Sequence, residues 1–143
     1  MYHGTSSEVA EAIRNGGIDL SKSRIKLDFG KGFYTTNNEA QAIKWSQRSL
    51  DGGDVLKFSV PKSEFENLNG LKFSEGSTEW EEFVRNNRLG NQLHDYDYVE
   101  GPMLLNKPRN FLNGQSPVSG GHQMSFHSKD AVQRLMKYLK NNS

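Results

Sequence analysis

The chain has 143 residues, of which 34% are hydrophobic and 24% are charged, and its formal net charge is +1. This length suits one core, so we expect residues 1–143 to form a single domain. A net charge near zero favours no class of charged partner. The sequence has no cysteine, which excludes disulfides and thiolate ligands, and no apolar run long enough for a membrane span or a secretory signal. We therefore expect a cytoplasmic protein without a membrane partner.

Hydrophobic periodicity and turn residues predict a mixture of helices and strands. Capping-box spacing predicts one helix that begins at Thr5 and a second that begins at Thr36. Asn69-Gly70 predicts a hairpin turn, and the stretch 104–121 predicts a long loop because it lacks periodicity. Ser77 and Ser128 are the expected caps of two later helices, and the expected strands are 2–4, 56–60, 65–68, 71–73, 96–99 and 122–127.

The segment 28–37, Asp-Phe-Gly-Lys-Gly-Phe-Tyr-Thr-Thr-Asn, is the most distinctive part of the chain. Gly30 and Gly32 allow a positive φ or the close approach of a ligand to the backbone, and an aromatic pair follows them directly. The spacing matches neither a Walker loop nor the Gly-x-Gly-x-x-Gly loop of dinucleotide-binding folds. Local spacing alone leaves two alternatives open, a ligand-binding loop and a tight turn before ordinary strand residues.

Trp45 is a candidate for a site because of its place on the predicted helix 38–49. Ala40, Ile43 and Leu50 lie along one side of that helix, and Trp45 lies on the opposite side. A tryptophan away from the core side covers a partner, a ligand or another layer of the fold. Packing under a neighbouring loop is the alternative that the spacing leaves open.

The strand 122–127 shows strict alternation of side chains. Alternation predicts that one face of this strand packs on the core and that the other is a wholly polar edge, which suits a cleft. The core-facing residues would be His122, Met124 and Phe126, and the polar face would carry Gln123, Ser125 and His127.

Three motifs in order resemble the His-Tyr-Glu class of diphtheria-toxin-like ADP-ribosyltransferases. They are His-Gly-Thr at 3–5, Phe-Gly-Lys-Gly-Phe-Tyr at 29–34, which is similar to a segment of the poly(ADP-ribose) polymerases, and a polar residue on a late strand. With Tyr-Asp-Tyr-Val at 96–99 and Gly-Pro at 101–102, the chain more narrowly resembles small bacterial ADP-ribosyltransferase-like domains. Some of these are encoded beside antitoxin-like genes. The resemblance implies an α+β fold, in which helices flank a split antiparallel β core.

The resemblance also implies a function. NAD would be the co-substrate, no metal would be needed, and a single ADP-ribose would pass to a macromolecular acceptor, either protein or nucleic acid. The protein would then be a bacterial toxin or effector with a possible cognate antitoxin. One alternative is a catalytically silent domain that binds NAD or ADP-ribose. Another is an interaction module on the same fold.

The resemblance assigns roles to individual residues. His3 would hold the adenosine ribose, the backbone of Gly4 would bond the nicotinamide amide, and Tyr34 would stack on the nicotinamide ring. Polymerases carry a second stacking tyrosine eleven positions beyond the first, and Trp45 stands at that place here. The NAD-binding residues implied by these motifs are His3, Gly4, Thr5, Gly32, Tyr34 and Trp45.

One position departs from the catalytic pattern of the superfamily. Catalytic members have glutamate on the late strand, and the matching residue here is Gln123, which would complete a catalytic set with His3 and Tyr34. A neutral amide accepts a ribose hydroxyl, but it supplies no charge and is not a general base. Glu100 and Asp97 are candidates for a carboxylate elsewhere, and Gln123→Glu would be expected to restore the charge.

Overall fold

The computed structural model describes residues 1–50, 52–91 and 94–140. They form a mixed α+β fold with one open, mostly antiparallel sheet of six strands in the order β3-β1-β2-β6-β5-β4, flanked by helices. The strands are β1 (Tyr2–Ser6), β2 (Phe33–Thr36), β3 (Gly53–Lys57), β4 (Gly70–Lys72), β5 (Tyr98–Leu104) and β6 (Ser119–Phe126). The helices are α1 (Ser7–Gly16), α2 (Glu39–Ser46), α3 (Thr78–Arg88), α4 (Pro108–Leu112) and α5 (Lys129–Met136), with 3-10 turns η1 (Leu20–Lys22) and η2 (Lys62–Phe65).

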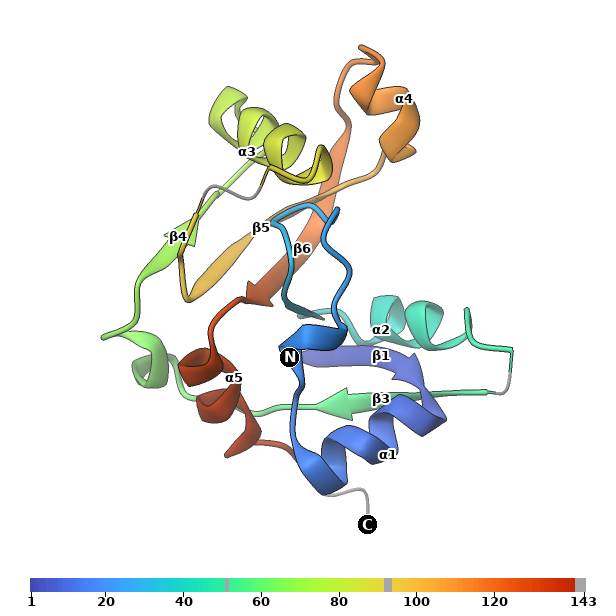
Figure 1. The fold of residues 1–143 in the computed structure, drawn as a ribbon, viewed down its shortest axis with the longest axis vertical. Coiled ribbons are helices and arrows are strands. Elements are labelled where there is room, and N and C mark those ends of the chain that lie inside the picture. Colours follow the sequence, from blue (N-terminus) through green and yellow to red (C-terminus); the bar gives the residue numbers. More distant parts are fainter. Residues whose placement is uncertain (51, 92–93, 141–143) are drawn as a thin grey trace.

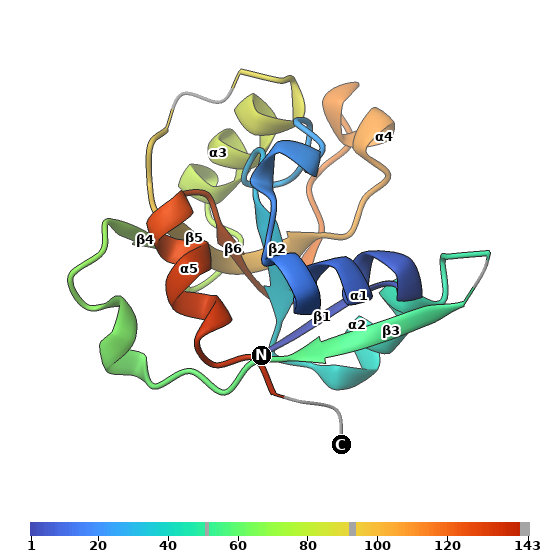
Figure 2. The ribbon, with the colours of Figure 1, turned by 60° about the horizontal axis from the view of Figure 1, so that its bottom comes forward.

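The register of the sheet divides the side chains between two hydrophobic cores. Residues directly opposite each other on neighbouring strands point to the same face. Phe33 and Phe126 are such a pair, and they pack in the core that α1 and α5 cover. Val99 lies opposite Ser125 on the other face, in the core that α3 and α4 cover. Figure 2 shows α5 in front of the sheet and α3 beyond it.

The sheet has a narrow joint between β1 and β2. Within the described residues these strands form one register pair, Tyr2 with Thr36, whereas β1 pairs with β3 along its whole length. The joint separates two parts of the molecule (Figure 1). One holds β1 and β3 with α1 and α2, and the other holds β4, β5 and β6 with α3 and α4. β1 and β2 therefore diverge beyond Tyr2.

Helix α2 lies unusually close to β1 and β3. A Cβ atom on Gly4 would stand 1.8 Å from the carbonyl oxygen of Ala42, and one on Gly53 would stand 2.0 Å from that of Ser46. The helix therefore buries Ala42 and Ser46 against glycines. The apolar side that the sequence predicts for this helix is wrong, because these three side chains are exposed: Ala40, Ile43 and Leu50.

Two of the four predicted helix caps are confirmed. Ser77 and Ser128 accept hydrogen bonds from the backbone of the first turns of α3 and α5. The predictions for Thr5 and Thr36 are wrong, because both threonines stay in the sheet, paired with Asp54 and Gln123. The helices begin later, and their observed caps are Ser6 and Asn38.

The predicted hairpin at Asn69-Gly70 is also wrong. Its second strand, β4, pairs in parallel with β5 instead, and the predicted first strand, 65–68, is not a strand, since Phe65 ends the turn η2 and 66–68 form turns. Asp97 holds Asn69, because its carboxylate accepts from the Asn69 N–H at 2.8 Å and its own N–H donates to the Asn69 carbonyl at 2.7 Å. A Cβ on Gly70 would lie 2.1 Å from the ring of Tyr98, so close packing explains this glycine.

The predicted long loop 104–121 contains regular structure. Pro108 occupies the first turn of α4, a place where its missing N–H costs nothing. Leu104 pairs with Ser119, so β5 and β6 extend into both ends of the predicted loop. This part of the chain is shaped by pairing between strands, which local periodicity does not reveal.

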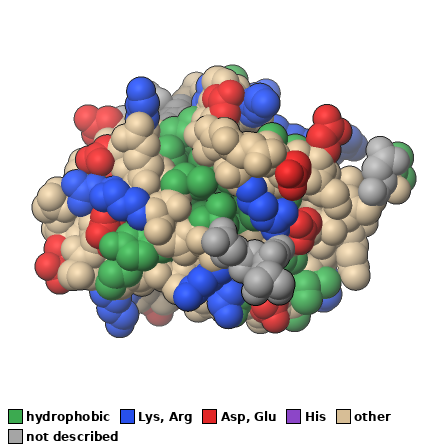
Figure 3. All heavy atoms as spheres, turned by 90° about the horizontal axis from the view of Figure 1, so that it is seen from below, with side chains coloured by type: hydrophobic (Ala, Val, Ile, Leu, Met, Phe, Trp, Pro, Cys, Tyr) green, Lys and Arg blue, Asp and Glu red, His purple; other side chains and the backbone are tan. Residues whose placement is uncertain are grey.

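The surface carries charges of both signs. Seen from below, Lys, Arg, Asp and Glu side chains surround a band of hydrophobic ones (Figure 3), in keeping with the net charge of +1. Among the helices formed by the described residues, none has the length and apolar character needed to cross a membrane.

Candidate functional site

A cleft of about 630 Å³ is lined by residues of β1 and β2 at the place where these strands diverge. Pockets of roughly 300–1,000 Å³ are typical of small-molecule sites. Five of the seven residues predicted from the sequence line this cleft, and Gly4 and Thr5 are not part of its lining. The five come from β1, β2 with the loop before it, α2 and β6: His3, Gly32, Tyr34, Trp45 and Gln123.

His3 joins the two diverging strands through its side chain. Its Nδ1 lies 2.6 Å from the backbone oxygen of Tyr34, and its ring stacks on Phe33 with 4.0 Å between centroids. A carbonyl only accepts, so Nδ1 carries the proton and donates. Burial lowers the pKa of His3 to about 4, and the ring is therefore neutral at pH 7. Its Nε2 is then a hydrogen-bond acceptor.

The backbone of Gly4 is directed toward the gap beyond the joint. Met1 exchanges two hydrogen bonds of 2.8 Å with Phe58, the residue before β1 pairing with the residue after β3. In an antiparallel ladder, successive residues direct their N–H and C=O groups to alternate sides. Thr5 therefore bonds toward β3, and Gly4 directs both groups to the side of β2. Among the described residues Gly4 has no register partner on β2, whereas Thr5 is part of the ladder with β3.

The glycine loop, which we define as residues 28–32, is held by the hydroxyl group of Tyr34. This hydroxyl accepts from the N–H of Phe29 at 2.9 Å and donates to the carbonyl of Gly30 at 2.6 Å. Burial raises the pKa of Tyr34, so the group stays protonated and remains a donor. Gly30 has a φ of 88°, a conformation that favours glycine.

Three further side chains fix the backbone of the glycine loop. His94 Nε2 lies 2.7 Å from the carbonyl oxygen of Phe29, and His127 Nδ1 lies 2.6 Å from that of Lys31. The N–H of Gly32 donates to Ser23 Oγ at 3.0 Å. The loop is therefore held in one conformation by groups on several elements before any ligand binds.

The two predicted stacking residues lie on different elements of the cleft. Trp45 projects from α2 and is half-buried, and Tyr34 is half-buried on β2. The Tyr34 ring is parallel to Phe29 within 20° at 6.4 Å and meets His127 edge-on. Among the described residues, no ring contact joins Tyr34 to Trp45. The cleft thus offers two aromatic side chains that do not pack on each other.

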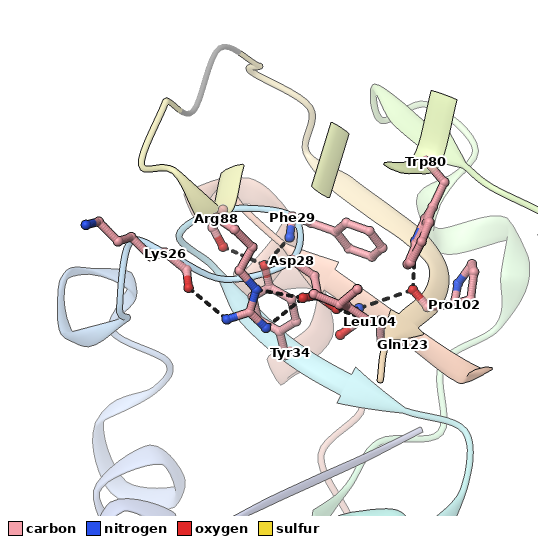
Figure 4. Close-up of polar contacts among 10 residues, drawn as sticks. Lys26, Asp28, Phe29, Tyr34, Trp80, Arg88, Pro102, Leu104 and Gln123 are labelled. Carbon is pink, nitrogen blue, oxygen red and sulfur yellow. Dashed lines mark hydrogen bonds and ion pairs between the residues drawn. The ribbon is translucent and has the colours of Figure 1, made fainter. Parts of the chain in front are cut away.

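Gln123 lies in a buried polar network with Asp28 and Arg88 (Figure 4). Its amide Nε2 donates to Asp28 Oδ2 at 2.7 Å and lies 3.4 Å from the carbonyl oxygen of Pro102. The second carboxylate oxygen of Asp28, Oδ1, accepts from Arg88 Nε at 2.8 Å and lies 2.6 Å from a terminal guanidinium nitrogen. Asp28 and Gln123 are 4% and 5% exposed, and both line the cleft.

Neither carboxylate proposed from the sequence reaches the cleft. Asp97 is engaged with Asn69, and Glu100 lies 3.1 Å from His122 Nε2 and 3.7 Å from Lys72. The carboxylate beside Gln123 is Asp28, which the sequence analysis missed as a site residue. Its place two residues before Gly30, in the same distinctive segment, was an available signal.

Arg88 was also missed, and no local pattern identifies it. It lies sixty positions from its partner Asp28, so only the tertiary structure brings the two together.

The polar face predicted for β6 is only partly correct. Gln123 lines the cleft, but Ser125 is fully buried, and its Oγ lies 2.7 Å from His127 Nε2. Since His127 Nδ1 donates to a carbonyl, Nε2 accepts and the serine donates. Burial lowers the pKa of His127 to about 4. This serine and histidine stabilise the glycine loop, both histidine nitrogens are engaged, and neither residue lines the cleft.

Cationic side chains also line the cleft. Lys22, Arg24 and Arg48 make no ion pair with any residue that the structure describes, whereas Arg88 is paired with Asp28. Lys22 acts electrostatically on Asp19, which also lines the cleft, so Arg24 and Arg48 are the cations that most suit an anionic ligand. The described residues contain no cluster of three or more His, Asp or Glu side chains arranged to hold a metal ion.

A comparison with protein families gives one match. The model of a family described as "Protein of unknown function (DUF3990)" matches residues 1–114. No curated protein matches the chain. The matched residues include the glycine loop, Trp45 and Arg88, and they end before β6, which carries Gln123.

Proposed function

We propose that this chain, which belongs to the DUF3990 family, binds NAD in the cleft and transfers one ADP-ribose to a macromolecule, as a bacterial toxin or effector. The proposal rests on one observation about the lining of the cleft. His3, Tyr34, Trp45 and Gln123 come from four separate elements and line the same cleft. The narrow joint between β1 and β2 supports, in addition, an ADP-ribosyltransferase-like split antiparallel β core.

The nicotinamide half of NAD fits the inner part of the cleft in chemical terms. A flat cationic ring is attracted to aromatic faces when water is excluded, and Tyr34 and Trp45 are the aromatic groups for this role. Gly4 stands beside the cleft and outside its lining, and its N–H and C=O, directed to the side of β2, would match the carbonyl and NH₂ of the nicotinamide amide.

The rest of NAD meets groups of matching chemistry. His3 Nε2 is an acceptor for a hydroxyl of the adenosine ribose. The pyrophosphate carries two negative charges, and Lys22, Arg24 and Arg48 supply cations that form no ion pair within the described part of the chain. Lys22 and Arg24 lie on the segment after α1, and Arg48 lies just after the end of α2.

The proposed reaction replaces one bond with another at the anomeric carbon of the nicotinamide-side ribose. The bond from this carbon to the nicotinamide nitrogen breaks, and its electron pair leaves with neutral nicotinamide. A nucleophilic atom of the acceptor protein or nucleic acid then bonds to the carbon, and its proton passes to solvent. Gln123 Oε1 would accept a ribose hydroxyl while positive charge develops on the sugar.

A second candidate function is a catalytically silent domain that binds NAD or ADP-ribose. The observation that favours it is that Gln123, at the place of the catalytic glutamate, carries no charge, while the neighbouring carboxylate of Asp28 is paired with Arg88. An interaction module, with no ligand in the cleft, is the third candidate. A cognate antitoxin would be a protein partner in the first case.

One experiment separates these functions. The protein is incubated with labelled NAD and cell extract, and both nicotinamide release and label in protein and nucleic acid are measured. A transferase labels one fraction, whereas a silent binder shows only a rise in melting temperature with NAD. An unchanged melting temperature at millimolar NAD, with no label, would leave the interaction module as the remaining candidate.

A further inference from the structure

We infer that Asp28 is a positioning residue that fixes the amide of Gln123, so that its oxygen is presented to the ligand as an acceptor. The inference concerns the site of the proposed function and rests on it for the identity of the ligand. It also explains why position 123 carries glutamine in this chain.

The orientation of the Gln123 amide follows from its neighbours. Asp28 Oδ2, at 2.7 Å, and the Pro102 carbonyl oxygen, at 3.4 Å, both accept hydrogen bonds. Only the NH₂ group of the amide can face two acceptors. The oxygen Oε1 then lies on the other side of the planar group and has no hydrogen-bond partner among the described residues. Because Gln123 lines the cleft, Oε1 is the acceptor that it offers to a ligand.

Asp28 is itself held from two directions. Arg88 binds Oδ1 with two nitrogens and is anchored by a further bond of 3.0 Å to the carbonyl of Lys26. The N–H of Leu104 donates to Oδ2 at 2.9 Å. Figure 4 shows these groups converging on the carboxylate. With both oxygens engaged, the carboxylate cannot rotate away from Gln123.

The carbonyl of Pro102 is fixed as well. The indole Nε1 of Trp80, a fully buried side chain on α3, donates to it at 3.0 Å. Both acceptors that face the Gln123 amide are therefore held by α3, one through Arg88 and the other through Trp80. This arrangement leaves the glutamine a single orientation.

This geometry reverses the expectation for Gln123→Glu. A carboxylate at position 123 would face the Asp28 carboxylate and the Pro102 carbonyl, three acceptors with no proton among them. The change therefore costs function, although it restores the charge found in catalytic relatives. The negative charge of this site resides on Asp28, and residue 123 must be a donor toward it.

The first test needs no ligand. Hydrogen exchange of the Gln123 side-chain NH₂ is measured by NMR, with the exposed Gln133 side chain in the same protein as reference. We expect exchange at Gln123 to be at least about tenfold slower than at Gln133, because both its acceptors are buried. Asp28→Asn should remove most of this protection. Equal exchange at the two glutamines overturns the inference, whether or not NAD binds.

The second test uses nicotinamide release from NAD. Gln123→Glu should lower kcat by at least about tenfold with a smaller change in KM, because it disturbs an acceptor used in the transition state. Asp28→Asn combined with Gln123→Glu should recover part of the loss, since the amide introduced at position 28 can donate to the carboxylate introduced at position 123. Recovery stays partial because the Leu104 N–H then lacks its charged acceptor.

The matched control is Glu100→Gln, a carboxylate-to-amide change on β5 outside the lining of the cleft. It should leave kcat and KM unchanged. A Gln123→Glu variant as active as wild type, or a double variant no better than Gln123→Glu alone, would overturn the inference. If wild type neither binds nor cleaves NAD, the proposed function fails, and the exchange measurement alone decides the role of Asp28.

Discussion

The Nδ1 of His3 donates a hydrogen bond to the backbone carbonyl of Tyr34 at 2.6 Å, so a side chain bridges β1 and β2 where their backbone pairing has ended. The bond connects the two residues to which the resemblance gives the central roles. It also fixes the protonation of the imidazole and leaves Nε2 as its acceptor. His3 thus has both a structural and a proposed binding role.

If the protein is a toxin, its expression in bacteria without an antitoxin should arrest growth. His3→Ala should relieve the arrest, because it removes both the bridge and the ribose acceptor. Growth curves of the two strains, with soluble protein measured in each, check this expectation. Harmless expression of soluble wild-type protein in several hosts would count heavily against a toxin.

Trp45→Ala should weaken NAD binding by about 1–2 kcal/mol through loss of one stacking face. The side chain is only half-buried, so the fold should persist. Calorimetric titration with NAD measures the effect. The matched control is Ile43→Ala, which truncates a 43% exposed side chain of the same helix outside the cleft. Equal affinity in wild type and Trp45→Ala would remove Trp45 from the site.

Tyr34→Phe should lower the free energy of unfolding by about 1–3 kcal/mol, because the Phe29 N–H and the Gly30 carbonyl lose their buried partner. The ring remains, so NAD affinity should fall less than in Trp45→Ala. Urea unfolding measures the stability. Tyr138→Phe is the control, since it removes a hydroxyl bound to Glu64 outside the cleft. A loss no larger than that of the control would contradict the role of Tyr34 in holding the loop.

Stability should fall as the pH falls from 6.5 to about 4. The ordinary histidine pKa is 6.5, and burial lowers the pKa of His3 and His127 to about 4. In this window the unfolded chain binds more protons than the folded one, so acid favours unfolding, by on the order of a few kcal/mol. Urea unfolding at several pH values measures how steeply the free energy of unfolding changes with pH. His127→Gln, which keeps a donor and an acceptor, should make this pH dependence weaker. An unchanged pH dependence would exclude His127 as one of its causes.

Gly4→Ala should destabilise the fold by at least about 2 kcal/mol, because the new methyl group would collide with the Ala42 carbonyl. Gly16→Ala, at the end of α1, is the control, since no atom lies within 4 Å of its new methyl group. Thermal unfolding of both variants gives the comparison. A Gly4→Ala protein as stable as wild type would mean that α2 lies farther from β1 than described.

The sequence predicted elements well where a local pattern decides them. Ser77 and Ser128 cap helices because a side-chain oxygen needs only a backbone three residues away. Thr5 and Thr36 offered the same pattern, yet the sheet holds both in strands. The hairpin prediction at Asn69-Gly70 was wrong for the same reason. Asp97 forms a hydrogen bond with Asn69, and Tyr98 pairs with Gly70, although both lie in a distant part of the chain.

Some residues of the candidate site were predictable from the sequence, but the contacts between them were not. His3, Tyr34 and Trp45 were identified from motifs and from the place of a tryptophan on a helix, and they line one cleft. The polar network around Gln123 was not foreseen, because Arg88 and Asp28 carry no sign of their pairing in the sequence. Long-range ion pairs depend on the packing of whole elements.

The order of the strands in space sets the order in which the protein can be completed during synthesis. β6 lies between β2 and β5, at the centre of the sheet, yet it is the last strand to leave the ribosome. Until residues 119–126 emerge, β2 and β5 each expose an unpaired edge, which is a template for aggregation. Between the completion of β5 at Leu104 and the emergence of β6 at Ser119, the nascent chain therefore consists of two incomplete halves, and the insertion of β6 joins the sheet and brings Gln123 to the cleft in one step.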